Sequence, residues 1–470
     1  MTTSKSFERS LQSLLGRKGW INSEDSLPWQ RDWLDKYGET PICVARPSST
    51  EEVSKVLQLC KKHSINVVIQ GGNTGLVGGS VLVKSRGIIL SLDRMNKIIC
   101  TDEVSKTVTL ESGVVLGQLH EVLKSKDLMF PMHLGSEGSA QIGGLIATNS
   151  GGSHSFRFGM MQDLVLGLEV VLADGKVWNG MREVQKDNTG YQLRKLFCGS
   201  EGTLGVITKA VLNLFPLPRQ QVTSLLSVRD LSDLLDISKK LGEEAGEFLT
   251  SIEFFSDTGL DIALKNIPEL VFPLEKRAPY YLLIEAGSSS TKIILESILL
   301  DVMQTCIDKK IVLDGTIASS EMQRKALWRL REEQPEGQRR LGVQLKHDIS
   351  VPPGKLVEFI DSAKKICNNL LPGVRINPFG HLGDGNVHFN LSPPEGKEDF
   401  SELDGEIYLR LAELASSMSG SFAAEHGIGR EKIIMADKLR DSIERDIMRK
   451  LKKSLDELNQ LNPGVLFSEK

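Results

Sequence analysis

Apolar and polar positions alternate along the first half of the chain in a way that predicts helices and strands in turn. Val53, Val56, Leu57 and Cys60 follow helical spacing, directly after a Ser49-x-x-Glu52 capping box. The apolar run 65–69 then predicts a buried strand. Further strands are expected at 41–47, 88–92, 107–111 and 165–172, and a helix near 116–126. This order is typical of an α+β or α/β fold.

The hydrophobic pattern breaks at Phe215-Pro-Leu-Pro218, which marks a domain boundary. Beyond it, helices are predicted at 229–242, 291–306, 353–370, 401–419 and 437–460, with strands at 251–255 and 280–285. With 470 residues the chain is too long for one core. We predict four segments, namely a helical lead at 1–38, a domain at 39–218, a second domain at 219–375 and a C-terminal segment at 376–470.

A glycine-rich loop, 70–80, directly follows the predicted strand at 65–69 and contains five glycines. Such a loop lets backbone amides approach a phosphate closely, although a flexible surface loop has the same composition. Neither G-x-G-x-x-G nor G-x-x-x-x-G-K-[ST] occurs in the chain, so a Rossmann site and a P-loop both lack their main motif. Similar clusters at 135–152 and 199–207 suit a long ligand such as an extended dinucleotide.

The segment 380–390 holds two of the eight histidines, His381 and His388, among three glycines. Asp384-Gly385 is a two-residue hairpin signal, and a turn there predicts that His381 lies directly opposite His388. Opposed residues have Cβ atoms roughly 4.5–5.5 Å apart, which suits two imidazoles on one metal ion. Asn390 would point to the same side. The pattern also fits a glycine-rich hairpin with two structural histidines.

Composition excludes some classes of protein. The chain is 40% hydrophobic and 25% charged, with a net charge of −4, which gives no support to nucleic-acid binding. Its six scattered cysteines form no C-x-x-C pair and indicate a reducing, cytoplasmic compartment. No apolar run could span a bilayer, and the first residues lack the apolar core of a signal peptide. Peripheral membrane contact and a homodimer stay open.

Several motifs together resemble a known superfamily of flavoproteins. Gly71-Gly-Asn-Thr-Gly75, the run 143–152, Lys186-Asp-Asn-Thr-Gly-Tyr191 and the run 199–207 resemble the FAD-binding domain of the vanillyl-alcohol oxidase and p-cresol methylhydroxylase superfamily. The hairpin motif 380–388 and Glu425-His-Gly-Ile-Gly429 are similar to its D-2-hydroxyacid dehydrogenase branch. The resemblance covers about 40–470. It implies an α+β fold with a two-part p-cresol methylhydroxylase-type FAD-binding domain, an α/β substrate-covering domain and a C-terminal helical segment.

The resemblance also implies the cofactor and its contacts. Some relatives tether flavin through a histidine in the first glycine loop, where this chain has Asn73, so non-covalent FAD is expected. The implied FAD-binding residues are Gly71, Gly72, Asn73, Thr74, Gly75, Gly78, Gly79, Ser80, Gly135, Ser136, Gly138, Ser139, Gly143, Gly144, Ala147, Thr148, Asn149, Gly151, Gly152, Gly205, Val206 and Ile207.

The implied chemistry is oxidation of a D-2-hydroxy acid, D-2-hydroxyglutarate or D-lactate, to the 2-oxo acid, with the hydride passing to flavin N5. Arg331 and Lys346 match family cations that hold a substrate carboxylate, and Asn390 would assist from the hairpin. His426 is the expected base, and His381, His388 and Glu425 the expected ligands of a divalent metal, zinc before manganese or iron(II).

Two features keep alternatives open. Pro335 stands where hydroxyglutarate dehydrogenases of the family tend to have threonine, which bears on a second substrate carboxylate. No haem or iron–sulfur motif is present, so the electron acceptor is expected to be external: an electron-transfer flavoprotein, a quinone or a cytochrome. Other readings are a glycolate oxidase-type flavoprotein subunit and a non-redox flavin-dependent transferase of the same fold.

Overall fold

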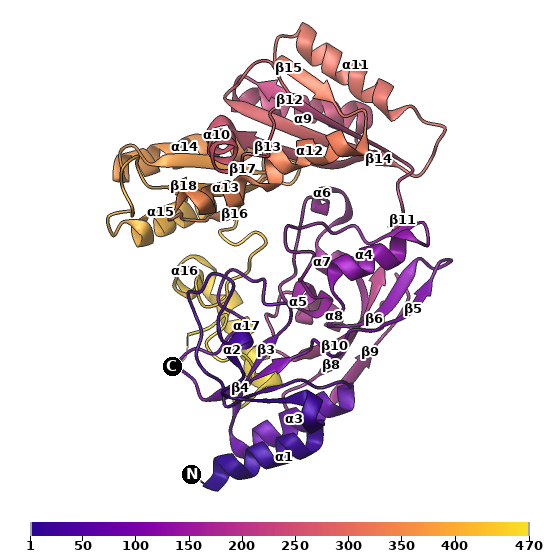
Figure 1. Ribbon diagram of the computed structural model, residues 1–470, viewed down its shortest axis with the longest axis vertical. Coiled ribbons are helices and arrows are strands. Elements are labelled where there is room, and N and C mark those ends of the chain that lie inside the picture. Colours follow the sequence, from indigo (N-terminus) through magenta and orange to yellow (C-terminus); the bar gives the residue numbers. More distant parts are fainter. Residues whose placement is uncertain (1, 469–470) are drawn as a thin grey trace. The chain divides into compact units, whose positions relative to one another are not determined.

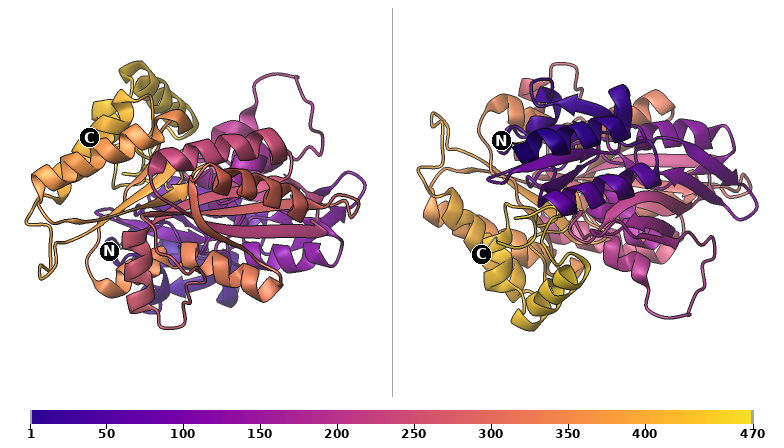
Figure 2. Two further views of the ribbon diagram at one scale, coloured as in Figure 1. Left: turned by 90° about the horizontal axis from the view of Figure 1, so that it is seen from above. Right: turned by 90° about the horizontal axis from the view of Figure 1, so that it is seen from below.

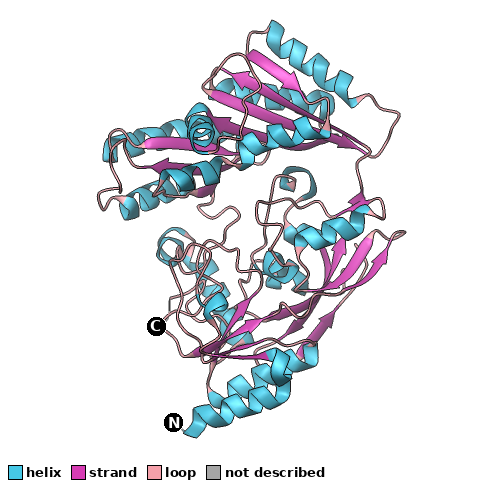
Figure 3. Ribbon diagram, viewed as in Figure 1, coloured by secondary structure: helices cyan, strands magenta, loops and turns pink. Residues whose placement is uncertain are grey.

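The computed structural model describes residues 2–468, which form two compact units. Unit 1 consists of the chain up to Gly152, Phe158–Leu217 and the C-terminal segment from Glu425. Unit 2 consists of Ser153–Arg157 and Pro218–Ala424. Figure 1 labels the elements of both units, Figure 2 gives two further views, and Figure 3 separates helices from strands. Among the described residues, none of the helices has the length and apolar character needed to cross a bilayer.

Unit 1 is built on two sheets. The first has the order β1-β2-β4-β3, in which β2, β4 and β3 run parallel. The second is antiparallel, with the order β5-β6-β10-β8-β9. The strands are β1 Trp20–Asn22, β2 Cys43–Ala45, β3 Asn66–Gln70, β4 Gly87–Ser91, β5 Ile98–Asp102, β6 Thr107–Glu111, β7 Leu128–Met129, β8 Val165–Val171, β9 Val177–Gly180, β10 Val206–Asn213 and β11 Phe215–Pro216, where β7 pairs with β11.

The helices of unit 1 are mostly short, and their ends follow local side-chain chemistry. They are α1 Thr2–Gly19, α2 Leu27–Gln30, α3 Thr50–His63, α4 Leu116–Lys124, α5 Ile142–Ala147, α7 Met161–Leu164, α8 Leu193–Phe197, α16 Ile433–Leu439 and α17 Ser442–Leu455; α6, Ser155–Phe158, begins in unit 2. Ser49 caps α3 by accepting from the Glu52 amide at 3.2 Å. The Glu52 carboxylate accepts from Ser48 instead of Ser49, so the predicted capping box is half formed.

The single C-terminal helix predicted at 437–460 is wrong. Two helices stand there because Asp441 interrupts the run: its carboxylate accepts from the amides of Ile443 and Glu444 and begins α17. After α17 the chain returns to the first sheet, where the Val67 amide donates to Gln460 and the Asn462 amide to Val67, each at 2.9 Å. The last described residues therefore complete the core of unit 1.

Unit 2 is one seven-stranded antiparallel sheet with the order β15-β12-β14-β13-β17-β18-β16. The strands are β12 Gln220–Val228, β13 Leu249–Ser256, β14 Tyr280–Ser288, β15 Val312–Ile317, β16 Asp348–Ser350, β17 Arg375–His381 and β18 Asn386–Ser392. The helices are α9 Leu231–Ala245, α10 Asp257–Asn266, α11 Leu295–Asp308, α12 Glu321–Glu332, α13 Gln334–Leu341, α14 Leu356–Leu370 and α15 Asp404–Ser417.

The two faces of this sheet differ in character. One face packs an apolar core against α9, α11, α14 and α15, with Phe254 and Leu282 among its strand residues. The other face carries a smaller apolar cluster, with Phe255, Leu283 and Trp328 of α12, and between those residues it buries carboxylates. Since a buried charge is costly unless it is paired, this second face needs partners for each carboxylate. It is the face from which the site is built.

Candidate active site

The glycine-rich loops of unit 1 pack directly on one another. A Cβ added to Gly72 would lie 2.0 Å from the carbonyl oxygen of Ser139, so the loop after β3 and the loop before α5 touch through backbone. The third cluster joins them, because the Gly199 amide donates to Ile146 at 3.1 Å and the Glu201 amide to Ala147 at 2.7 Å. Three segments far apart in sequence thus meet in unit 1.

Some predicted cofactor-binding glycines border open space. At Gly75, Gly135, Gly138 and Gly144 an added Cβ would meet no other atom within 4 Å. Backbone that is accessible in this way can approach a phosphate closely, as the glycine content predicts. These positions fit an extended dinucleotide, and they are spread over the first and second loops.

Other predicted glycines have a packing reason that involves no ligand. A Cβ on Gly143 would lie 2.6 Å from Ser112 Cβ, one on Gly152 would lie 2.3 Å from the His133 oxygen, and Gly78 has φ +70° against Tyr37. Gly205, Val206 and Ile207 stand at the start of β10, where both apolar side chains belong to the unit 1 cores. Some glycines of these motifs are therefore explained by tight packing, and others leave the backbone accessible to a ligand.

Asn73, in the first glycine loop, is held by protein contacts. Its φ is +53°, its side-chain amide donates to the Arg31 oxygen at 2.7 Å, and its oxygen accepts from Ser80 at 2.7 Å. Asparagine tolerates this left-handed conformation better than most residues. The contact orders the first glycine loop.

The register of the histidine hairpin differs from the prediction. β17 ends at His381 and β18 begins at Asn386, so His381 lies opposite Asn386, and His388 lies opposite Phe379. The turn has four residues, with Gly385 at φ +79°. A Cβ on Gly385 would lie 2.0 Å from the Val351 oxygen, and this close approach helps to fix the longer turn. The prediction of directly opposed histidines is wrong.

The two histidines still share a face of the sheet, on a diagonal. Phe379 and His381 are two residues apart on one strand and point the same way, and His388 is opposite Phe379. The imidazole centroids are 5.7 Å apart with the rings at 77°. A pair of imidazoles at this separation is consistent with two ligands of one metal.

Each histidine has a buried carboxylate beside it. His381 Nδ1 lies 2.6 Å from Glu253 Oε1, within hydrogen-bond distance, and His388 Nδ1 lies 4.0 Å from Asp348 Oδ1. Glu253 on β13 and Asp348 on β16 are each 1% exposed. The sheet register places both, since Glu253 pairs with His381 and Asp348 with His388.

Arg331, on α12, is buried and not a solvated surface charge. Its Nε donates to Glu253 Oε2 at 3.0 Å, and its guanidinium carbon lies 4.8 Å from the centroid of the Phe379 ring. Burial by itself raises the pKa of the Glu253 carboxyl, but His381 and Arg331 outweigh it and lower the pKa. The carboxylate is therefore held ionised between two cationic or proton-donating groups.

Lys346 and Asn390 lie across from each other in the same sheet. Leu345 bridges Leu391, and the Phe389 amide donates to the His347 oxygen, which sets Lys346 opposite Asn390 and on the face of His388. Burial lowers the pKa of the Lys346 ammonium. Asn390 donates to Gln338 Oε1 at 3.1 Å. The three substrate-binding residues predicted in unit 2 thus belong to the face that carries the histidine pair.

Glu425 and His426 begin the C-terminal segment of unit 1. Glu425 directly follows Ala424, whose amide donates to the Asp348 oxygen at 3.4 Å. Gly427 has φ +79°, so the bend expected after His426 is present. The Glu201 carboxylate accepts from the amides of Ile428 and Gly429, each at 2.8 Å, and burial raises the pKa of Glu201 to about 7. The third glycine cluster therefore anchors the segment that carries His426.

Comparisons with known proteins agree with this geometry. A family described as "FAD binding domain" matches residues 41–180, and "FAD linked oxidases, C-terminal domain" matches residues 217–466. Relatives include D-2-hydroxyglutarate dehydrogenase, mitochondrial, from Danio rerio, which is 37% identical over 92% of this chain and 79% of its own length.

The chain belongs to the FAD-dependent D-2-hydroxyacid dehydrogenase family.

Another relative is D-2-hydroxyglutarate–pyruvate transhydrogenase from Saccharomyces cerevisiae, 33% identical over 96% of this chain and 92% of its own. Among solved structures, p-cresol methylhydroxylase with substrate bound has a TM-score of 0.77 at 16% identity, covering 100% of this chain and 98% of that one. The predicted fold class is confirmed, as is FAD as the cofactor. As a member of this family the protein is an FAD-dependent oxidoreductase.

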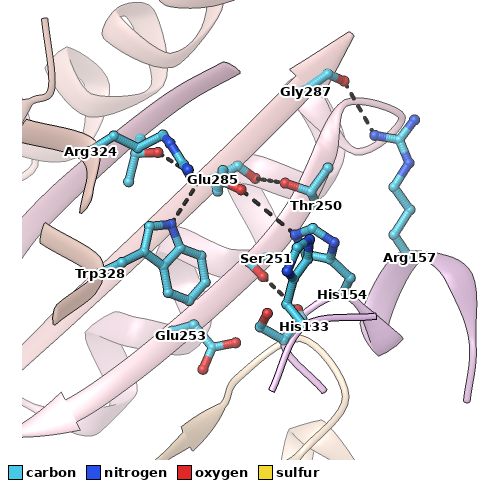
Figure 4. Close-up of polar contacts among 12 residues, drawn as sticks. His133, His154, Arg157, Thr250, Ser251, Glu253, Glu285, Gly287, Arg324 and Trp328 are labelled. Atoms are coloured by element: carbon cyan, nitrogen blue, oxygen red, sulfur yellow. Dashed lines mark hydrogen bonds and ion pairs between the residues drawn. The ribbon is translucent and has the colours of Figure 1, made fainter. Parts of the chain in front are cut away.

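Two groups in this dehydrogenase escape sequence reasoning. Oε2 of Glu285, on β14, accepts hydrogen bonds from Trp328 and Arg324 within 2.9 Å (Figure 4). Thr223 donates to the same oxygen at 2.9 Å. His154 Nε2 lies 3.7 Å from the other oxygen, Oε1. These partners lower the pKa of Glu285 to about 2 although burial opposes them. Separately, ligand atoms of His120, His133 and Glu137 in unit 1 lie within 4.8 Å of one another. Each group also draws on residues far apart in the sequence, so neither is contained in one sequence motif.

Proposed function

We propose that this protein oxidises a D-2-hydroxy acid, D-2-hydroxyglutarate or D-lactate, to the 2-oxo acid and passes the electrons to an external acceptor. The observation that carries the proposal is the second face of the unit 2 sheet. It presents His381 and His388 together with Lys346 and Asn390, next to Arg331. Two imidazoles with nearby cations suit an anionic substrate that is held through its carboxylate.

The donor set fits a divalent metal. We assign His381, His388 and Glu425 as its ligands, since two imidazoles and a carboxylate are a common set for zinc, manganese and iron(II). When bound, the metal supplies a Lewis acid that lowers the pKa of the substrate hydroxyl. Lys346 and Arg331 orient the carboxylate, and Asn390 donates a hydrogen bond from its amide.

The protein's part in the redox step is to hold the substrate and to accept a proton. FAD, bound without a covalent link, supplies the acceptor for the C2 hydride at its N5 atom. His426 accepts the hydroxyl proton on an imidazole nitrogen, which suits a group whose ordinary pKa is near neutral.

Two observations bear on the substrate. The names of the Danio rerio and Saccharomyces cerevisiae relatives favour D-2-hydroxyglutarate, while Pro335 removes a side-chain donor that a second carboxylate would use. Pro335 stands in the first turn of α13, four residues beyond Arg331. The name of the yeast relative adds a 2-oxo acid to the candidate acceptors, which otherwise are an electron-transfer flavoprotein, a quinone or a cytochrome.

The deciding experiment is anaerobic reduction of the FAD-loaded protein, followed by flavin absorbance. D- and L-2-hydroxyglutarate, D- and L-lactate, malate and glycolate are each added before and after chelation. We expect bleaching by one D-isomer and its loss on chelation. A yellow protein that no acid reduces would instead favour the transferase or subunit reading.

Two variants control this experiment. His388→Ala is expected to abolish both metal binding and reduction, because it removes one of the assigned ligands. His120→Ala changes the other histidine group, in unit 1, and is expected to leave both intact. A reversed result, with loss on His120→Ala alone, would contradict the assigned metal ligands.

A further inference from the structure

Glu253 stands at a junction on the second face of the unit 2 sheet. Its two oxygens accept from different partners: Oε1 from His381 Nδ1 at 2.6 Å and Oε2 from Arg331 Nε at 3.0 Å. The carboxylate is 1% exposed and His381 is 7% exposed, so bulk water does not compete for these bonds. One buried side chain thereby links a proposed metal ligand with a proposed substrate-binding residue.

The hydrogen bond to Nδ1 decides what the other nitrogen of His381 can do. A neutral imidazole carries one proton, and when Nδ1 holds it to donate to Glu253, Nε2 keeps its lone pair. A lone pair at a fixed position is what a metal ligand needs. Carboxylates that accept from the far nitrogen of a metal-binding histidine fix its tautomer and ring orientation and make it a stronger ligand.

Arg331 secures the carboxylate in turn. Its bond to Oε2 orients the carboxylate plane, and stacking on Phe379 holds the guanidinium, whose other donors are not used in this bond. Phe379 and His381 lie two residues apart on β17 and face the same way. The contacts therefore form a chain: Phe379 packs on the Arg331 guanidinium, Arg331 donates to Glu253, and Glu253 is hydrogen-bonded to His381.

The support for the second histidine is weaker. Asp348 lies 4.0 Å from His388 Nδ1, and its Oδ1 already accepts from the Asn386 amide at 3.0 Å. The 2.6 Å between Glu253 Oε1 and His381 Nδ1 is a hydrogen-bond length, whereas the 4.0 Å between Asp348 Oδ1 and His388 Nδ1 exceeds one. The support is thus concentrated on the His381 side.

We propose that Glu253 is a positioning residue for the metal site: it holds His381 in the tautomer that offers Nε2 to a divalent metal, and it couples that nitrogen to Arg331. The inference rests on the proposed function, because it assumes that His381 binds a metal.

The first test is the metal affinity of the FAD-loaded protein, measured by competition with a chromophoric chelator for Zn²⁺ and Mn²⁺. Glu253→Gln keeps the volume but places an amide donor or a weaker acceptor against the imidazole. We expect its metal affinity to fall by about 10- to 100-fold, with flavin content unchanged. Glu253→Asp keeps the charge and is expected to recover part of the loss.

Glu285→Gln is the matched control, since Glu285 is also 1% exposed, lies on the same face and accepts from an arginine of α12. It is expected to keep the wild-type metal affinity. Equal affinity in Glu253→Gln and the wild type would overturn the inference and leave the proposed function standing. A wild-type protein that binds no metal yet is reduced by a hydroxy acid would overturn the metal assignment itself.

A measurement on the wild-type protein avoids any dependence on how the variants fold. Nitrogen-15 spectra of the histidine side chains, assigned with His381→Gln, report which ring nitrogen carries the proton in the metal-free protein. We expect His381 to be the Nδ1–H tautomer at neutral pH. An Nε2–H tautomer would overturn the inference whatever the variants do.

Discussion

Glu253 and Glu285 have similar surroundings, but the hydrogen bonds to their two carboxylate oxygens are distributed differently. Both lie on one face of adjacent strands, both accept from an arginine of α12, and both have a histidine beside them. One oxygen of Glu285 takes three donors, and its histidine lies 3.7 Å from the other oxygen. Glu253 instead takes one donor at each oxygen, and its histidine bond is 2.6 Å.

The difference teaches that a buried His–Glu–Arg group is not by itself a sign of chemistry. At Glu285 the hydrogen bonds fasten strand β12, strand β14 and helix α12 together, which is a structural task. At Glu253 the 2.6 Å hydrogen bond is made with His381, and the ring of His388, on the same hairpin, lies next to that of His381. What separates the two groups is the distribution of donors, and the following experiments test that distinction.

Removing the Glu285 carboxylate is expected to have the largest effect on stability. Glu285→Ala leaves the Trp328 indole N–H and the Thr223 hydroxyl without this acceptor and removes one of the two carboxylate partners of Arg324, at a cost of about 3–5 kcal/mol in the free energy of unfolding. Calorimetry is expected to show a markedly lower thermal midpoint, with metal bound per folded molecule unchanged. A midpoint within a degree of the wild type would mean that Glu285 has no structural task.

The stability of unit 2 is expected to fall in acid because of the same group. The pKa of Glu285 is lowered to about 2 in the folded chain from its ordinary value of 4.5. A lowered pKa contributes stability that is present above pH 4.5 and is lost as the pH falls toward 2, and the shift corresponds to about 3 kcal/mol. Urea denaturation from pH 5 to pH 2 measures this loss of unfolding free energy. If the unfolding free energy of Glu285→Gln fell as steeply with pH as that of the wild type, the attribution to Glu285 would be contradicted.

On the Glu253 side the expected effects are on substrate binding. Lys346→Met removes a half-buried cation from the face of His388, and KM for the acid is expected to rise about tenfold, the loss of one hydrogen bond to a charged group. Steady-state kinetics check this, with Lys346→Arg expected to recover part of the affinity. Lys240→Met, on the surface of α9, is the control and is expected to leave KM unchanged.

The smallest effect is expected at His154. Its Nε2 lies 3.7 Å from the Glu285 oxygen, farther than the donors of Arg324 and Trp328, so the loss of this one contact in His154→Gln is expected to lower the free energy of unfolding by less than about 1 kcal/mol. The corresponding His381→Gln change is expected to abolish metal binding. Comparable losses of metal from both variants would remove the distinction between the two groups.

Sequence reasoning reached the family and the fold because the glycine motifs are local and specific. It missed the hairpin register, because the four-residue turn depends on the approach of Gly385 to Val351, which no local pattern encodes. It missed Glu253 for a similar reason. That residue is one acidic position inside an apolar strand, and its partners, His381 and Arg331, lie 128 and 78 residues further along the chain.

Helices α12 and α13 were also missed, and in α13 the reason is that Pro335 and Gly337 weaken the helical pattern. Pro335 is accommodated in the first turn of α13, where its missing amide is no loss. Helix α12 supplies the three side chains that bond to the two buried glutamates, namely Arg324, Trp328 and Arg331. Their spacing of four and three residues is a one-faced helical spacing, but they are polar or aromatic and not the apolar residues that the pattern seeks.

The closure of unit 1 by residues 425–468 has a consequence for biosynthesis. On the ribosome, unit 2 is complete once Ala424 has emerged, since its segments all precede that residue. Unit 1 must wait for the last stretch, because Val67 bonds to Gln460 and Asn462, and Lys452 bonds to the Thr203 and Leu461 oxygens. Unit 1, whose first segment precedes unit 2 in the sequence, is therefore the later of the two to finish folding, and a ribosome stalled before codon 460 would hold an unfinished unit 1 and a finished unit 2.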